Sequence, residues 1–202
     1  MKLYFSPGAC SMSPHIVLRE IGAPFEAERI DGRTHLTASG KNYYDINPKG
    51  SVPCLVLDDG QVLTEGAVIV QYLADHAPGA SLAPKAGTME RYRLQEWLNF
   101  IATDLHKGLS PLYNPKLPDE IVRQVKERFG QRLDFVEKQL AKGPFLMGEQ
   151  FTVADAYLFT IVSWGKRFNI DLGKWPALTA FMEKMRARPA VQATLKAEGL
   201  PA

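Results

Sequence analysis

Cys10 is the residue of this chain best placed to do chemistry, because it lies between a predicted strand and a predicted helix. The apolar run Leu3–Phe5 is typical of a buried strand, and Ser6–Gly8 predicts a sharp turn after it. A thiol on such a loop lies at the positive end of the helix dipole, which favours the nucleophilic thiolate. A lone cysteine more commonly packs as a small buried side chain. The small neighbouring residues leave room for a ligand and favour the reactive role.

The helix after Cys10 is predicted from its capping residues and its apolar spacing. Ser11 and Ser13 are candidate N-cap residues, and Pro14 suits a first helical position, where its missing N–H costs nothing. The apolar pattern then continues until Gly22, where we expect the helix to end.

Length and composition are those of a globular protein of one or two domains. The chain has 202 residues, and its 24 basic residues nearly balance its 22 acidic ones. Nothing in this balance calls for nucleic acid or an anionic membrane as a partner. We expect a cytoplasmic protein, since we find no signal peptide and no apolar run of the ~18 residues that a span needs. Cys10 and Cys54 are then free thiols, and no cluster of residues has metal-ligand spacing.

The first part of the chain alternates strands and helices. A second strand is predicted over Phe25–Ile30, and residues 33–44 form a loop with a short helix. Two further strands flank Asp58–Gly60, a strong hairpin signal. A helix opens at Thr64–Gly66, which gives the order βαβ followed by ββα. We place a linker over residues 78–88, which lack periodicity.

The remainder of the chain is predicted to be helical. Apolar side chains recur at three- and four-residue spacings over residues 94–105, 122–140 and 153–168, and shorter helices follow around Phe181 and Val191. The segment Thr152–Asp155 is similar to a capping box with Asp in place of Glu. The expected domains are therefore residues 1–80, with mixed α+β structure, and residues 87–202, all helical.

The βαβ–ββα order, with Cys10 just before the first helix, suggests a thioredoxin-like fold, and Val52–Pro53 supports it. Such domains place a cis bond where Val52–Pro53 lies, and a cis bond would leave the Val52 backbone free to pair with an extended peptide. The Cys10–Ser13 segment lacks the second cysteine of a dithiol motif. Glu65 and Gly66, at a helix start, could hold the charged groups of an α-amino acid, although alone Glu65 would merely complement the helix dipole.

Taken in order, these motifs resemble the beta class of bacterial glutathione transferases over essentially the whole chain. The matching segments are Tyr4–Ser11, Asn47–Pro53, Thr64–Gly66, Trp97–Ile101, Leu105–Lys107 and Thr152–Asp155. The resemblance implies a thioredoxin-like domain that binds glutathione as co-substrate, and a helical domain that shapes a site for a small hydrophobic electrophile. It also implies a homodimer active in detoxification.

The resemblance assigns roles to particular residues. Cys10 would face the glutathione sulfur and form a mixed disulfide, and His106 would be a second donor to that sulfur. Without the resemblance, His106 would be a residue that satisfies a helix C-terminus. The remaining glutathione contacts would come from His35, Val52, Glu65, Gly66, Asn99, Thr103 and Asp104.

Two positions differ from the family pattern. Relatives usually have a serine where this chain has Gly66, which leaves only the backbone there. Some relatives carry a lysine at position 35 for the glycyl carboxylate, and His35 in its place would make glutathione affinity sensitive to pH near neutrality. Asp104 would reach the ligand of the partner subunit.

The function predicted from these residues is conjugation of the glutathione thiolate to small hydrophobic electrophiles. Two alternatives stay open on the same fold: a glutaredoxin-like thiol–disulfide oxidoreductase, and a non-catalytic binder of hydrophobic ligands. We read Cys54, inside an apolar strand, as buried and inert.

Overall fold

The computed structural model describes residues 1–77 and 79–201, and these residues form two compact units. The first, here called the N-terminal unit, comprises Met1–Ser81 together with Arg186–Ala202. The second, the helical unit, comprises Leu82–Met185. The predicted linker lies between the last helix of residues 1–81 and the first helix of the helical unit, and its residue Pro78 lies outside the described residues.

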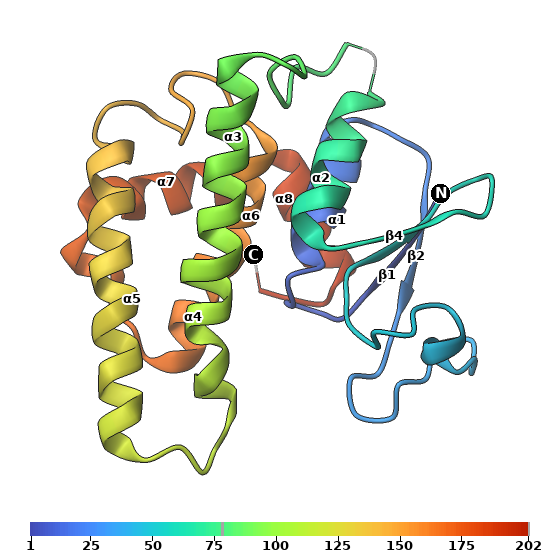
Figure 1. The fold of residues 1–202 in the computed structure, drawn as a ribbon, viewed down its shortest axis with the longest axis horizontal. Coiled ribbons are helices and arrows are strands. Elements are labelled where there is room, and N and C mark those ends of the chain that lie inside the picture. The colour runs from blue at the N-terminus through green and yellow to red at the C-terminus, as the bar shows by residue number, and fades with distance from the viewer. Residues whose placement is uncertain (78, 202) are drawn as a thin grey trace. The chain divides into compact units, whose positions relative to one another are not determined.

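A four-stranded mixed sheet forms the centre of the N-terminal unit (Figure 1). Its strands are β1 (Lys2–Phe5), β2 (Glu26–Arg29), β3 (Cys54–Val56) and β4 (Val62–Thr64), in the order β2–β1–β3–β4. β1 pairs parallel with β2 and antiparallel with β3, and β3 pairs antiparallel with β4. This topology confirms the predicted βαβ–ββα order and the thioredoxin-like fold.

Three helices complete the N-terminal unit: α1 (Met12–Glu20), α2 (Gly66–Asp75) and α8 (Pro189–Ala197). α1 packs against both α2 and α8 (Figure 1). Leu3 and Leu55 from the sheet and Ile16, Ile69 and Leu73 from the helices are almost completely buried, so they form the core that fixes the loops at the strand ends.

α1 begins directly after Ser11, the first of the two candidate N-cap residues, and two residues before Pro14, the expected first helical position. The Met12 N–H donates to the Ala9 carbonyl (3.0 Å) and the Ser13 N–H to the Cys10 carbonyl (3.2 Å), so the loop already turns into the helix. Ser11 is the N-cap by position, but its hydroxyl makes no cap hydrogen bond. Ser13 and Pro14 therefore lie inside the first helical turn.

The end of α1 is as predicted. Gly22 has a φ of +63°, the left-handed conformation that glycine adopts without a steric penalty. Its N–H donates to the Arg19 carbonyl, and the Ala23 N–H donates to the Leu18 carbonyl. These two bonds form a Schellman motif, which satisfies carbonyls at the helix end and turns the chain toward β2.

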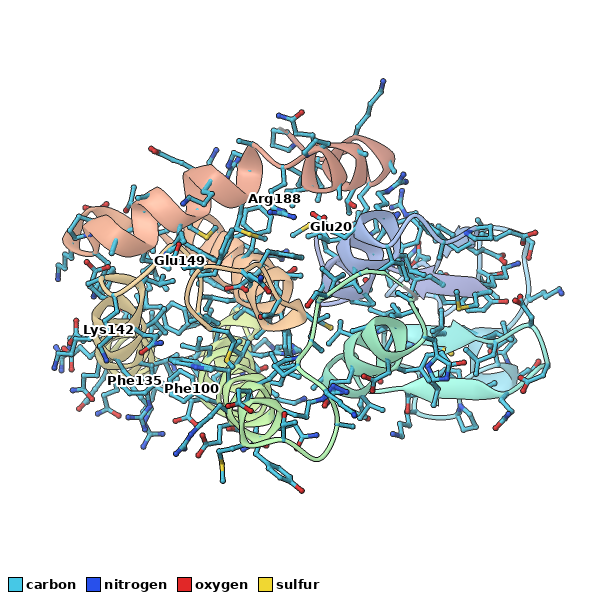
Figure 2. All side chains as sticks on the ribbon, turned by 90° about the horizontal axis from the view of Figure 1, so that it is seen from above. Glu20, Phe100, Phe135, Lys142, Glu149 and Arg188 are labelled. Atoms are coloured by element: carbon cyan, nitrogen blue, oxygen red, sulfur yellow. The ribbon has the colours of Figure 1, made fainter. Side chains whose placement is uncertain are left out.

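The C-terminal segment packs with the N-terminal unit, whereas the expected division assigned all of residues 87–202 to one helical domain. Arg188 forms a two-pronged ion pair with Glu20 of α1, at 2.7 and 2.9 Å (Figure 2). Glu198 is buried against His15 of α1, with 2.8 Å between Oε1 and Nδ1. Sequence periodicity predicts that α8 is a helix but carries no information about which unit it joins.

The helical unit contains the other helices. They are α3 (Met89–Phe100), α4 (Lys107–Leu109), α5 (Asp119–Leu140), α6 (Val153–Ser163) and α7 (Pro176–Arg186). The predicted capping box is present at the start of α6, where Asp155 accepts from the Thr152 N–H at 2.7 Å. Between α3 and α4 the segment Ile101–His106 is a π-helix, a distortion often found at functional sites. Within residues 1–77 and 79–201, no helix combines the length and apolar content needed to cross a membrane.

A buried carboxylate ties β1, β2 and the following loop together. Glu28 accepts from Lys2 (2.6 Å) and from both the hydroxyl (2.6 Å) and the N–H (3.0 Å) of Ser39. Burial alone would raise the pKa of Glu28, but these hydrogen bonds outweigh burial and lower the pKa from 4.5 to about 2. The ionised carboxylate thus stabilises the folded state, by about 3 kcal/mol at neutral pH.

The pH dependence of stability tests this network. Because the pKa of Glu28 is lower in the folded chain, its contribution is present above pH 4.5 and is lost as the pH falls toward 2. We expect Glu28→Gln to lower the free energy of unfolding at pH 7, and the difference from wild type to narrow below pH 4.5. Urea denaturation measures both. The control is Glu26→Gln, an exposed neighbour of the same lysine. A difference that stayed constant with pH would contradict the assignment.

Candidate functional site

The thiol of Cys10 meets the backbone of Val52. Its Sγ donates to the Val52 carbonyl across 3.1 Å, and the Val52–Pro53 peptide bond is cis, as predicted. The contact joins the loop after β1 to the loop before β3. Only the protonated thiol can donate here, so this contact favours the thiol over the predicted thiolate. Cys10 is partly exposed and open to a reagent or a ligand.

The loop that carries Cys10 is held by residues on both sides of it. Ser11 Oγ lies within hydrogen-bond distance of both the N–H (3.1 Å) and the carbonyl (3.2 Å) of Ser6. The Gly8 N–H donates to Glu198 Oε2 at 2.8 Å, while the other oxygen of that carboxylate bonds His15. A charge-assisted network that is fully buried holds a backbone more firmly than an exposed one. The loop is therefore fixed by α1 and by the C-terminal segment.

Glu65 and Gly66 lie at the start of α2, as expected. Glu65 is the N-cap residue, with a φ of +68°, and its carboxylate accepts from Lys49 Nζ at 2.7 Å. The same Lys49 amine donates to Thr64 Oγ1. Glu65 thus already binds an amine, in an exposed ion pair. A Cβ at Gly66 would lie 3.6 Å from the Pro53 ring, an ordinary contact, so α2 begins beside the cis proline.

His35 lies on the loop that precedes these residues. It has a φ of +53°, and its ring stacks on Tyr44 with 4.6 Å between centroids. A Cβ on Gly50 would lie 2.5 Å from the Tyr44 ring, and Gly50 has a φ of +66°, so both the ring and the backbone favour glycine there. Among the described residues, the buried His35 Nδ1 has no hydrogen-bond partner. A buried ring nitrogen without a partner is unusual in a folded protein.

In the helical unit, His106 is a neutral imidazole at physiological pH. Burial, and secondarily the charge of Lys107, lowers the pKa of His106 from 6.5 to about 4. Its Nδ1 lies 2.7 Å from the Tyr157 hydroxyl. When Tyr157 donates to Nδ1, the ring proton lies on Nε2, which can then act as a donor.

Aromatic side chains continue from His106 through the helical unit. Trp164 lies edge-on to His106, with 5.0 Å between centroids, and Tyr113 packs edge-on against both Trp164 (5.9 Å) and Phe168 (5.0 Å). The Arg167 guanidinium lies 4.9 Å from the centre of the Tyr113 ring. We call Tyr113, Trp164 and Phe168 the aromatic cluster. Such a surface suits an apolar or aromatic ligand.

The other predicted residues of the helical unit are linked by hydrogen bonds around the π-helix. The Thr103 hydroxyl lies 3.0 Å from both the Asn99 carbonyl and Asp104 Oδ2. Asp104 Oδ1 lies 2.8 Å from Arg132 Nε of α5. Asp104 thus has an intramolecular cation as its partner.

The second cysteine lies in the core. Cys54 is completely buried in β3, and burial raises the pKa of its thiol. The prediction that it is buried is confirmed, and a protonated, inaccessible thiol is inert. In the described part of the chain, no group of three or more His, Cys, Asp and Glu side chains could hold a metal ion.

Sequence reasoning missed several residues that orient the predicted ones. They are Tyr157, which the apolar spacing over residues 153–168 assigns to the core, and His15 and Glu198, which no sequence pattern links to the site. Each acts through a hydrogen bond that no spacing rule reveals, since His106 and Tyr157 are 51 residues apart and His15 and Glu198 are 183 apart. The one signal available was chemical: a tyrosine or a carboxylate on an apolar helix face needs a polar partner.

A thioredoxin-like unit with a cysteine beside a cis proline, joined in one chain to an all-helical unit, defines the class of fold. Family models match the two parts: "Glutathione S-transferase, N-terminal domain" over residues 8–76, and "Glutathione S-transferase, C-terminal domain" over residues 100–189. The chain therefore belongs to the glutathione S-transferase family.

Individual relatives agree with this assignment. The chain is 44% identical to glutathione S-transferase GstA of Escherichia coli O157:H7, over 99% of this chain and 100% of that protein. It is 54% identical to BphK, a bacterial glutathione transferase solved as a ternary complex, with a TM-score of 0.97 over 99% and 100% of the two chains. A beta-class enzyme from Sphingomonas chungbukensis is 43% identical, with a TM-score of 0.95 over the full length of both chains. The resemblance to the bacterial beta class is confirmed.

Proposed function

We propose that this chain conjugates the thiolate of glutathione to small hydrophobic electrophiles. The observation that carries the proposal is the contact between Cys10 and Val52 beside the cis proline, in a chain of this family. A peptide paired with the Val52 backbone would place its cysteinyl sulfur next to the Cys10 thiol. Holding thiolate and electrophile in one site supplies the proximity that lowers the barrier, and stabilising the thiolate supplies the nucleophile.

Four residues of the N-terminal unit would bind the tripeptide. The Val52 backbone would pair with the cysteinyl unit by strand addition. Glu65 would accept from the γ-glutamyl amine, in competition with Lys49, and the N–H groups at the start of α2, including that of Gly66, would hold the γ-glutamyl carboxylate. His35, on the loop before these residues, would contact the glycyl carboxylate.

Cys10 and His106 would donate to the glutathione sulfur. The low pKa of His106 keeps its imidazole neutral above about pH 4, so it would act on the thiolate as a neutral hydrogen-bond donor and not as a positive charge. The hydrogen bond to Tyr157 supports the tautomer with the proton on Nε2. Asn99, Thr103 and Asp104 would close the site, and Asp104, which pairs with Arg132 of its own chain, would also reach the ligand of a partner subunit.

The aromatic cluster would bind the electrophile. Tyr113 is the exposed ring of this cluster, and it packs on Trp164, which is buried beside His106. This arrangement supports aromatic or otherwise hydrophobic substrates. The same arrangement would also suit a non-catalytic protein that binds hydrophobic ligands. The activity test below distinguishes the two, because such a protein would show no conjugation.

Thiol–disulfide exchange is a second candidate activity, favoured by the partly exposed Cys10 thiol. The Cys10 thiolate would attack the glutathione sulfur of a mixed disulfide between glutathione and another thiol, which forms a Cys10–glutathione disulfide and releases the other thiol as its thiolate. A glutathione thiolate would then attack the glutathione sulfur of the Cys10 disulfide, which regenerates the Cys10 thiolate and releases glutathione disulfide.

A homodimer and a cytoplasmic location complete the proposal. A cavity of about 630 Å³ on the helical unit supports the dimer, since Trp97, Phe100 and Phe135 line it. The rings of Phe100 and Phe135 lie 5.3 Å apart (Figure 2), and Phe135 is 53% exposed. Exposed aromatic surface of this kind is typical of protein interfaces.

Activity of the wild-type chain and two Cys10 variants tests the function. The wild type should conjugate glutathione to an aryl halide. Cys10→Ala removes one donor to the thiolate and should lower that rate by about 10-fold. Cys10→Ser, the matched control, keeps a donor and should retain conjugation, while both variants lose thiol–disulfide exchange. No conjugation by a wild type that binds glutathione would contradict the transferase proposal.

The oligomeric state tests whether the cavity lined by Trp97, Phe100 and Phe135 lies in the dimer interface. Phe135→Glu places a charge among Trp97 and Phe100, so we expect it to convert a dimer into a monomer in sedimentation velocity. Ile121→Glu changes an exposed apolar residue of the same helix that does not line this cavity, so this variant should remain a dimer. A wild-type monomer at micromolar concentration, or a dimeric Phe135→Glu, would contradict this part of the proposal.

A further inference from the structure

The Ser51 carbonyl accepts two hydrogen bonds from buried side chains. The Tyr43 hydroxyl donates to it at 2.9 Å, and the Asn47 amide donates at 2.8 Å. Ser51 itself is exposed, on the loop that leads into the cis proline. The residue is exposed, yet its carbonyl faces two buried side-chain donors, and this arrangement calls for an explanation.

Both donors are fixed by their surroundings. Tyr43 is completely buried, and burial raises the pKa of its hydroxyl, which therefore stays protonated and able to donate. Asn47 is 1% exposed. Its side-chain oxygen accepts from the Lys49 N–H at 3.2 Å, so its amide nitrogen faces Ser51. Neither side chain can reorient without losing a buried hydrogen bond.

The carbonyl that these donors hold belongs to the peptide group that precedes Val52. The Ser51 carbonyl and the Val52 N–H lie in one planar unit, on opposite sides of a trans bond. Two hydrogen bonds to the oxygen therefore set the direction of the N–H, which points away from Tyr43 and Asn47. They also polarise the peptide group and make the N–H a stronger donor.

We propose that Tyr43 and Asn47 are positioning residues that aim the Val52 N–H at a carbonyl of the bound peptide. This inference rests on the proposed function, since it takes glutathione as that peptide. The Val52 carbonyl is oriented separately, by Cys10. The two polar atoms through which Val52 would pair with glutathione are thus held by different residues, and the pair Tyr43 and Asn47 controls the N–H alone.

Tyr43→Phe is the variant that tests the inference, because it removes one donor and keeps the ring. We expect the Kd for glutathione, measured by calorimetry, to rise about 3- to 10-fold. The KM for glutathione should rise in parallel, while kcat stays within about 2-fold of wild type. In a ¹H–¹⁵N spectrum of the ligand-free chain, the Val52 amide resonance should move. Asn47→Ala should have the same effects, and Tyr43→Phe carries the test if Asn47→Ala does not fold.

Tyr4→Phe is the matched control. Tyr4 lies in the same core cluster, with its ring centroid 5.7 Å from that of Tyr43, and its hydroxyl lies toward Lys2. This variant loses the same atom and should bind glutathione as the wild type does. Equal affinities of wild type and Tyr43→Phe, or an equal loss in Tyr4→Phe, would overturn the inference. A wild type that bound no glutathione would instead overturn the proposed function, and the inference with it.

Discussion

The backbone around Val52 is the constraint on which the N-terminal unit's site depends. Cys10 donates to its carbonyl, and the preceding carbonyl is held by Tyr43 and Asn47. The cis peptide then leads into β3, and Pro53 packs beside the start of α2. A change in the Val52 backbone would therefore move the thiol, the peptide-binding edge and the helix terminus together.

The C-terminal segment extends this constraint to the cysteine loop. One Glu198 carboxylate oxygen accepts from the Gly8 N–H and the other bonds His15, and the side chains of Glu198 and His15 are fully buried. Arg188, just before α8, pairs with Glu20 of α1. These contacts explain why the last residues belong to the N-terminal unit although they follow the helical unit in the chain. The position of Cys10 is thus set by residues from both ends of the sequence.

The sequence predicted the elements better than their polar contacts. Strand order and the capping box at Thr152 followed from local patterns, because period and capping chemistry are local properties. Of the two candidate N-cap residues of α1, Ser11 lies at the helix start, but backbone bonds from Met12 and Ser13, and not its hydroxyl, form the first turn. The partners of Cys10 and His106 are distant in sequence. Only the folded chain reveals them, together with the burial that lowers the pKa of His106.

A titration of the ¹⁵N-labelled full chain with glutathione, followed by amide resonances, shows whether glutathione binds at the Val52 backbone. If glutathione pairs with the Val52 backbone and with the start of α2, the amides of Val52 and Gly66 should show the largest shifts. Saturable binding that leaves both amides unmoved would contradict the account, because the peptide would then bind elsewhere on the molecule.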